Sequence, residues 1–253
     1  MTLLVDAGNT GLKWARLAGG RLGAVAAVTH RGVEPEAWQA RLAALAPPPG
    51  RVVVANVAGA AFEARFRAWT ERQWRLTPEF PTASAERLGV TNAYARPGAL
   101  GVDRWLAMLA AWRAAPVPLV VASAGTAFTV DLVDADGRHR GGCIVPGERL
   151  MREALHAQTS GVAAAALLDR AAVDGAFGVN TAGAVQQGAR LALAALVDRA
   201  ARALEAASGV APRIYFAGGS ADEVAPLVSR AVKVVPHLVL EGLALLAAEE
   251  VPA

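Results

Sequence analysis

The chain contains little cysteine, lysine or tyrosine, and no long membrane-like segment. Its 253 residues include one cysteine and four histidines. One cysteine excludes an internal disulfide framework and a multi-cysteine metal site, and the wide spacing of the histidines speaks against a histidine-built metal site. No uncharged apolar run reaches about 18 residues, as a membrane-spanning helix requires, and the N-terminal segment lacks the pattern of a signal peptide. We therefore expect a soluble cytoplasmic protein without a membrane partner.

The sequence has no cluster of residues with charge of one sign. Lysine and arginine total 25, aspartate and glutamate total 22, and the formal net charge is +3. The arginines are scattered, without the basic runs that are typical of nucleic-acid-binding tails, so no nucleic-acid partner is expected. The 54% apolar and 19% charged fractions exclude a disordered chain.

Apolar runs and helical spacings alternate along the chain, which is typical of an α/β fold. Runs at 3–7 and 12–17 are joined by Gly8-Asn9-Thr10, which predicts a β-hairpin. Runs at 117–122 and 128–133 predict a second strand–turn–strand unit. Hairpins at the start of both halves argue against a purely parallel sheet.

A short internal similarity indicates a duplication. Asp6-Ala7-Gly8-Asn9-Thr10 and Ser123-Ala124-Gly125-Thr126-Ala127 occupy the same place in their strand–turn–strand units, about half the chain apart. We expect two related α/β domains, residues 1–114 and 115–253, with a cleft between them. No flexible linker divides them, so we expect tight packing.

The first turn has the composition of a phosphate-binding site. Glycine and asparagine in a tight turn direct backbone N–H groups at one point, and such a nest binds phosphate oxygens. Thr10 adds a hydroxyl and Lys13 adds a positive charge, while Asp6 suggests a cation such as hydrated Mg²⁺ between carboxylate and phosphates. An ordinary hairpin turn would also use glycine and asparagine. The candidate ATP-binding residues here are Asp6, Ala7, Gly8, Asn9, Thr10, Gly11, Leu12 and Lys13.

Two later segments offer similar chemistry. Gly125-Thr126 supplies backbone N–H groups and a hydroxyl, and Gly218-Gly219 follows a predicted strand and precedes a predicted helix. Glycines allow a ligand to approach the backbone closely, and a helix N-terminus favours anions. Three such elements in this order are stronger evidence than any one of them.

The order of these motifs resembles the actin-like (ribonuclease H-like) ATPase superfamily of sugar kinases, chaperones and actin. Within it, the sequence is most similar to the type III pantothenate kinases. The resemblance covers nearly the whole chain. It rests on Asp6 to Thr10, Gly101-Val102-Asp103-Arg104, Gly125 to Asp131, and Gly142 to Gly147.

The resemblance implies a fold and an activity. It implies duplicated actin-like domains with mixed sheets flanked by helices. It also implies phosphorylation of pantothenate with ATP and Mg²⁺, the first step of coenzyme A synthesis, by a homodimer. The first turn and Thr126 would contact ATP, and Asp103 would be the catalytic proton acceptor. The residues implied to bind pantothenate are Tyr94, Gly101, Val102, Asp103, Arg104 and Thr181.

One position departs from the family pattern. The family commonly has an aspartate two residues before the Gly-Thr-Ala turn, where it binds a required monovalent cation such as K⁺ or NH₄⁺. This chain has Ser123 there, which offers an oxygen ligand but no charge. Either the cation requirement is weakened or lost, or another carboxylate replaces the aspartate.

Physical chemistry supports two roles and leaves alternatives to each. A carboxylate within reach of an alcohol can accept its proton during phosphoryl transfer, which fits Asp103; compensation of a helix dipole is the alternative. The planar fork of Arg104 could grip a carboxylate; otherwise it is a solvated surface charge. We expect Cys143 to be a small core residue and His139 to lie on an exposed hairpin arm.

Two other functions remain open at this level. The chain could be a non-catalytic, nucleotide-binding accessory factor for transcription on the same fold, and Ser123 is the one feature favouring that. It could also be another kinase or phosphatase of the superfamily, although it has little room for a large sugar-binding insertion.

Overall fold

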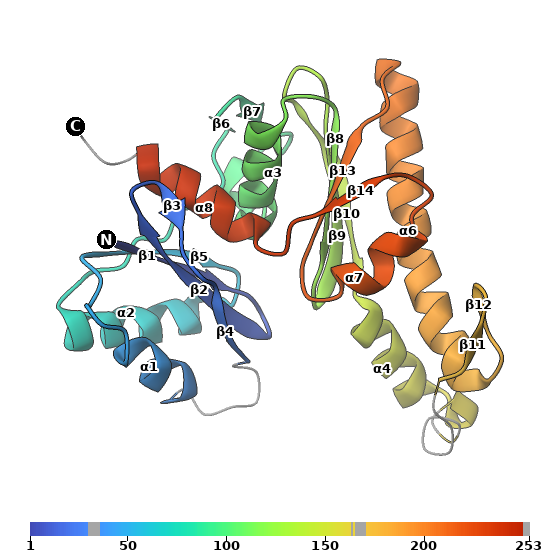
Figure 1. Ribbon diagram of the computed structural model, residues 1–253, viewed down its shortest axis with the longest axis horizontal. Coiled ribbons are helices and arrows are strands. Elements are labelled where there is room, and N and C mark those ends of the chain that lie inside the picture. Colours follow the sequence, from blue (N-terminus) through green and yellow to red (C-terminus); the bar gives the residue numbers. More distant parts are fainter. Residues whose placement is uncertain (30–35, 163, 165–170, 250–253) are drawn as a thin grey trace. The chain divides into compact units, whose positions relative to one another are not determined.

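The computed structural model describes residues 1–29, 36–162, 164 and 171–249 (Figure 1). The chain folds into two compact units, one of Met1–Ala114 with His237–Ala253 and one of Ala115–Pro236. None of the helices in the described part of the chain combines the length and apolar character that crossing a membrane requires.

The first unit is a five-stranded mixed sheet with helices on both faces. The strands run in the order β3-β2-β1-β5, with β4 also paired to β2. β1 is antiparallel to β2 and parallel to β5. The elements are β1 (Thr2–Ala7), β2 (Gly11–Ala18), β3 (Arg21–Leu22), β4 (Ala26–Thr29), α1 (Glu36–Ala43), β5 (Arg51–Asn56), α2 (Ala60–Trp74), β6 (Glu86–Arg87), β7 (Val90–Thr91), the 3₁₀ turn η1 (Pro97–Ala99), α3 (Val102–Ala114) and α8 (Leu238–Glu249).

Side chains along β1 point alternately to the two faces of the sheet, and this alternation determines which of them pack against α1 and α2. Leu3, Val5 and Ala7 pack in one apolar cluster with aromatic side chains of these two helices. Successive side chains of a strand point to opposite faces of the sheet, so Asp6 points to the face that α3 and α8 cover. The polar end of β1 therefore lies on the side of the sheet where α3 begins.

The last helix belongs to the first unit, whereas the sequence analysis placed residues 237–253 in the second domain. α8 packs against α3 and the first sheet, and a Cβ on Gly242 would collide with the backbone of Leu106. Arg51 of β5 donates a hydrogen bond to the Ala247 carbonyl at 2.8 Å. The close approach of Gly242 to the Leu106 backbone allows α8 to pack against α3. No pattern in the sequence predicts this contact.

The second unit is a sheet in the order β10-β9-β8-β13-β14. Its elements are β8 (Leu119–Ala124), β9 (Ala127–Val133), β10 (His139–Pro146), α4 (Glu148–Gln158), β11 (Val173–Asp174), β12 (Phe177–Gly178), α6 (Thr181–Ser208), β13 (Arg213–Ala217), α7 (Ala221–Val224), the 3₁₀ turn η2 (Ala225–Leu227) and β14 (Val232–Val234). Figure 1 shows the long helix α6 lying along this sheet. Apolar side chains of α6 and α7 cover one face of β8, β9 and β13.

The two sheets share a topology. In each, an antiparallel hairpin (β1–β2 or β8–β9) is extended by a further antiparallel strand on one side and a parallel strand on the other. The predicted duplication of a mixed α/β unit is confirmed, as are both opening hairpins.

Three sequence expectations differ from the structure. Residues 77–100, expected to be mostly loop, contain the β6–β7 hairpin and η1. Cys143 is exposed on the edge strand β10 instead of lying in the core. His139 is buried, and its Nε2 lies 2.9 Å from the equally buried Asp131 Oδ1, because a β-bulge between His139 and Gly142 shifts the register of that edge. Part of the expected mixed segment 158–180, namely 163 and 165–170, lies outside the described residues.

Candidate active site

Asp6 is a partly buried carboxylate at the end of β1. It pairs across the hairpin with Lys13 of β2, and directly opposed residues of antiparallel strands share a face of the sheet. Burial raises the pKa of Asp6 from its ordinary value of 3.8 to about 6; the Lys13 charge lowers it and the Asp103 charge raises it. The electrostatic coupling indicates that these three groups lie near one another within the first unit.

In the turn after Asp6, partly or fully exposed polar residues lie between strand ends whose side chains are buried. Gly8 donates its backbone N–H to the Gly11 carbonyl at 3.1 Å, closing the turn, and Asn9 is exposed. Ala7 and Leu12 are fully buried in the cluster with α1 and α2. Of the predicted ATP-binding residues, these two can therefore contribute only backbone groups.

Asp103 lies in the first turn of α3, where Gly101 leaves room for its carboxylate. Its Oδ1 accepts a hydrogen bond from the Arg104 backbone N–H at 2.9 Å. A Cβ on Gly101 would lie 2.7 Å from that oxygen, so a larger residue there would require the Asp103 side chain to move. Glycine therefore leaves room for the carboxylate in the orientation that the Arg104 N–H gives it.

Arg104 is buried and held by Tyr94. The residue as a whole has 5% relative exposure. Its Nη1 donates to the Tyr94 hydroxyl at 3.1 Å, and the central carbon of its guanidinium lies 5.9 Å from the centroid of that ring. Asn92 orders the loop: its Oδ1 accepts the Tyr94 backbone N–H, and its Nδ2 donates to two backbone carbonyls, one of them Pro97. The predicted residues Tyr94, Gly101, Val102, Asp103 and Arg104 therefore form one local assembly.

In the second unit, the two glycine elements meet at the end of β8. Gly218 has φ +96°, and a Cβ there would collide with the backbone of Ala124, the residue before Gly125. Ser220 donates its N–H to the Ala124 carbonyl at 3.2 Å. The predicted Gly125-Thr126 turn and the Gly218-Gly219 turn are thus neighbours.

A third glycine closes this turn from the side of α4. Gly147, which precedes α4, donates its N–H to the Thr126 carbonyl at 3.0 Å, and a side chain there would collide with the Gly125 carbonyl. Ser123 lies nearby on β8, paired with Thr129 of β9 and with Ala217 of β13. Backbone groups of three segments therefore surround the turn.

Thr181 opens α6 on the rim of an apolar groove. Asn180 caps this helix by accepting the Gly183 N–H at 2.8 Å. The groove has a volume of about 910 Å³ and runs between α4 and α6 from Pro146, which pairs with Ala127 of β9. Thr181 is the only predicted pantothenate-binding residue in the second unit.

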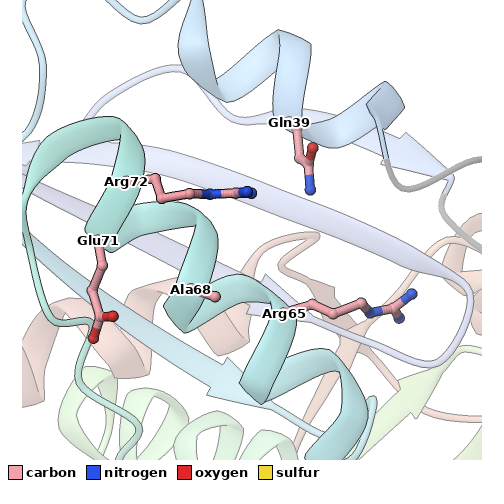
Figure 2. Close-up of a pocket in the computed structure, with 5 residues that line it drawn as sticks. All are labelled: Gln39, Arg65, Ala68, Glu71 and Arg72. Atoms are coloured by element: carbon pink, nitrogen blue, oxygen red, sulfur yellow. The ribbon is translucent and has the colours of Figure 1, made fainter.

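A second hollow lies away from these groups. Figure 2 shows its lining side chains on α1 and α2, among them Arg65 and Arg72. Its volume is about 520 Å³. Because α1 and α2 cover the face of the sheet opposite to Asp6, this hollow is separate from the predicted phosphate turn, and none of the predicted site residues lines it.

Comparison with known proteins decides the family. The sequence profile of type III pantothenate kinases matches residues 2–203. The chain belongs to the type III pantothenate kinase family. A type III pantothenate kinase from Halorhodospira halophila is 40% identical over 253 residues, covering 96% of both chains. One from Nitrosococcus oceani is 34% identical, covering 96% of this chain and 92% of the relative.

Solved structures support the fold expected for a type III pantothenate kinase. A Campylobacter jejuni protein described as a Baf family transcriptional activator has a TM-score of 0.62 at 19% identity, covering 98% of each chain. A ROK family glucokinase from Streptomyces griseus has a TM-score of 0.51 at 14% identity, covering 98% of this chain and 99% of that one. The predicted actin-like, sugar-kinase architecture is confirmed.

Two residues that lie close to the predicted site residues were not predicted from the sequence to belong to the site. Asn92 organises the Tyr94 loop through three hydrogen bonds, and an Asn two residues before a Tyr carries no distinctive signal. His237 lies near Lys13; burial lowers the pKa of His237, and the Lys13 charge lowers it further. No spacing rule relates residues 13 and 237, because only the packing of α8 on the first sheet brings them together.

Proposed function

We propose that this chain transfers the γ-phosphoryl group of ATP to the hydroxyl of pantothenate, forming 4'-phosphopantothenate, with Asp103 as the proton acceptor. Family membership over most of the chain supports the activity. The observation that carries the residue assignment is the grouping of Asp6, Lys13 and Asp103 within one unit.

The turn of each unit is proposed to bind the phosphates of ATP. Phosphoryl transfer depends mainly on positioning and on neutralising charge, and preorganised N–H donors supply this without reorganising. Asn9 and Thr10 are proposed to supply such groups from the first unit and Thr126 from the second, while the N–H groups of Gly8 and Gly125 close their turns on the carbonyls of Gly11 and Ala127. Lys13 forms no ion pair within the described residues, so its ammonium group is available to a phosphate.

The donor set fits a magnesium ion shared with ATP. No cluster of three or more metal-ligating side chains exists among the described residues, and Mg²⁺ is commonly held by one or two carboxylates plus substrate phosphates. Asp6 is a partly buried carboxylate whose charged form is disfavoured by burial and by Asp103, and a divalent cation relieves both effects. When bound, the cation neutralises charge on the transferring phosphoryl group.

Asp103 and Arg104 are proposed to handle the acceptor. The Asp103 carboxylate, oriented by the Arg104 N–H, takes the proton of the attacking hydroxyl. The Arg104 guanidinium, braced by Tyr94, binds the pantothenate carboxylate through its planar fork. Thr181 is proposed to complete the acceptor site.

Replacing Arg104 by Lys should raise the KM for pantothenate by about 10-fold or more, because lysine cannot reproduce a bidentate contact. The KM for ATP should change less than about 2-fold, a difference that steady-state kinetics with each substrate varied in turn would measure. Tyr94→Phe, which keeps the ring under the guanidinium and removes one hydrogen bond, should have a smaller effect in the same direction. Equal rises in both KM values would refute the assignment of Arg104.

The primary test is ADP release from Mg-ATP with and without pantothenate, in potassium, ammonium and sodium buffers. We expect pantothenate-dependent turnover that varies less than about 3-fold among the three cations, since Ser123 supplies no charge to hold a monovalent ion. Ser123→Asp should strengthen the preference for potassium or ammonium over sodium. A strong potassium requirement in the unchanged protein would indicate that another carboxylate replaces the family aspartate.

The apolar groove at α6 is proposed as the interface of a homodimer. Val179 and Leu155 line it with relative exposures of 66% and 42%, and Phe177, one residue before Gly178 of the lining, has a relative exposure of 71%. Contiguous exposed apolar surface marks an interaction site in most soluble proteins. The family resemblance implies a dimer, so we propose that a second copy of this chain covers the groove.

Val179→Glu should convert the dimer to a monomer, because a charge would be buried at the interface. Light scattering coupled to size exclusion would report a mass near twice 26.0 kDa for the unchanged chain and half that for the variant. Val210, an exposed valine beyond the end of α6, provides the control Val210→Glu, which should stay dimeric. A Val179→Glu dimer would place the interface elsewhere.

The accessory-factor alternative is not favoured. It was raised by Ser123 alone, and the curated relatives that match over almost the whole chain are named as kinases. The likeness to the Campylobacter jejuni protein, at 19% identity, concerns the fold.

A further inference from the structure

His237 stands at the start of α8, beside the phosphate turn of the first unit. It directly precedes Leu238, the first helical residue, and its carbonyl accepts the Glu241 N–H at 3.0 Å. α8 packs against β1 and β2, the strands that carry Asp6 and Lys13. The Lys13 charge acts on the imidazole, which is partly buried.

The surroundings of His237 favour a neutral ring with its proton on Nε2. Nδ1 is buried and has no hydrogen-bond partner, and an imidazolium would require a proton on both nitrogens. Burial and Lys13 lower the pKa of His237, and Glu241 opposes them with a smaller effect. The backbone N–H groups of the first helical turn carry partial positive charge, which disfavours an N–H at the buried Nδ1. The neutral ring therefore carries its proton on Nε2.

Two donors thus lie near the turn without a protein acceptor in the described chain. Nε2 of His237 forms no hydrogen bond there, and Lys13 forms no ion pair there. The charged groups that act on this pair are Asp6 on β1, Glu241 on α8 and Lys13 itself. A lysine and an N–H donor beside a turn of backbone amides form a donor set for an oxyanion.

We propose that His237 is an additional nucleotide-binding residue, which donates a hydrogen bond from Nε2 to a phosphate oxygen of ATP held at the Asp6–Lys13 turn. This inference rests on the proposed function of that turn. A neutral donor adds affinity without adding charge where Lys13 and a divalent cation already neutralise the phosphates. The residue acts in binding, and proton transfer stays with Asp103.

Calorimetric titration with ATP in the absence of pantothenate tests the assignment. His237→Ala should raise the Kd for ATP about 10- to 100-fold, the usual worth of one hydrogen bond to a charged acceptor. His237→Gln, whose side-chain amide places an N–H at a similar distance from the backbone, should restore the Kd to within about 2-fold of the unchanged protein. Binding of adenosine, which lacks phosphates, should be the same in all three proteins.

A histidine outside the site provides the control. His156→Ala, in the last turn of α4, should leave the Kd for ATP unchanged. An unaltered Kd in His237→Ala, or an equal loss for ATP and adenosine, would overturn the inference and indicate a structural role at the start of α8. Absence of pantothenate-dependent turnover in the unchanged protein would instead contradict the proposed function, while the titrations would still decide the role of His237.

Discussion

Asp103→Asn should lower kcat for pantothenate phosphorylation by about 100-fold or more, since a positioned general base typically contributes a factor of about 10² to 10⁴. The Kd for ATP should change less than about 2-fold, because the phosphates are assigned to the turns and to Lys13. Asparagine keeps the oxygen that accepts the Arg104 N–H, so the first turn of α3 should stay intact. Single-turnover kinetics together with ATP titration separate these two effects.

The competing reading of Asp103 is an acid that only compensates the α3 dipole, and a matched variant addresses it. Glu63 is the acidic residue in the first turn of α2, which lies on the opposite face of the sheet. If Asp103 served the dipole alone, Asp103→Asn and Glu63→Gln would each cost about 1 kcal/mol of stability or less and leave kcat unchanged. Near-normal turnover in Asp103→Asn would thus remove the catalytic base from the proposed mechanism.

Local patterns in the sequence predicted the strands and turns to which we assign the chemistry. Glycine and asparagine in a short connection between apolar runs can form few structures other than a tight turn, so both hairpins and their turn residues followed from the sequence. A tight turn is set by a few neighbouring residues, which is why a local pattern reveals it. The clash at Gly218 is of another kind, because a Cβ there would meet the backbone of Ala124, which is distant in the sequence.

Long-range packing could not be predicted in the same way. The membership of α8 in the first unit depends on Gly242 meeting the backbone of Leu106, and the proximity of His237 to Lys13 follows from that packing. His139 is buried with its side chain hydrogen-bonded to that of Asp131, on a strand whose register shifts between His139 and Gly142; its arginine neighbours in sequence indicated the opposite. Each of these features joins residues whose separation in sequence carries no periodic signal.

Asp6→Asn should make the ligand-free protein more stable at pH 8 while nearly abolishing its activity. The folded-state pKa of Asp6, about 6, lies above the ordinary value of 3.8, so the folded protein binds this proton more tightly than the unfolded chain. Stability from this group is present at low pH and is lost as the pH rises from about 4 through 6. A shift of about two units corresponds to roughly 3 kcal/mol, and a neutral asparagine avoids that loss.

Chemical denaturation of both proteins at several pH values would measure the effect. The gain in unfolding free energy should be about 2 to 3 kcal/mol at pH 8 and should shrink toward zero near pH 4, where the aspartate is itself neutral. With Mg-ATP at pH 8 the order should reverse, because only the aspartate can share a divalent cation with the phosphates and be stabilised by the ligand. A variant without the pH-dependent gain would mean that the Asp6 charge is already well solvated in the free protein, and that strain relief by a cation is not part of its role.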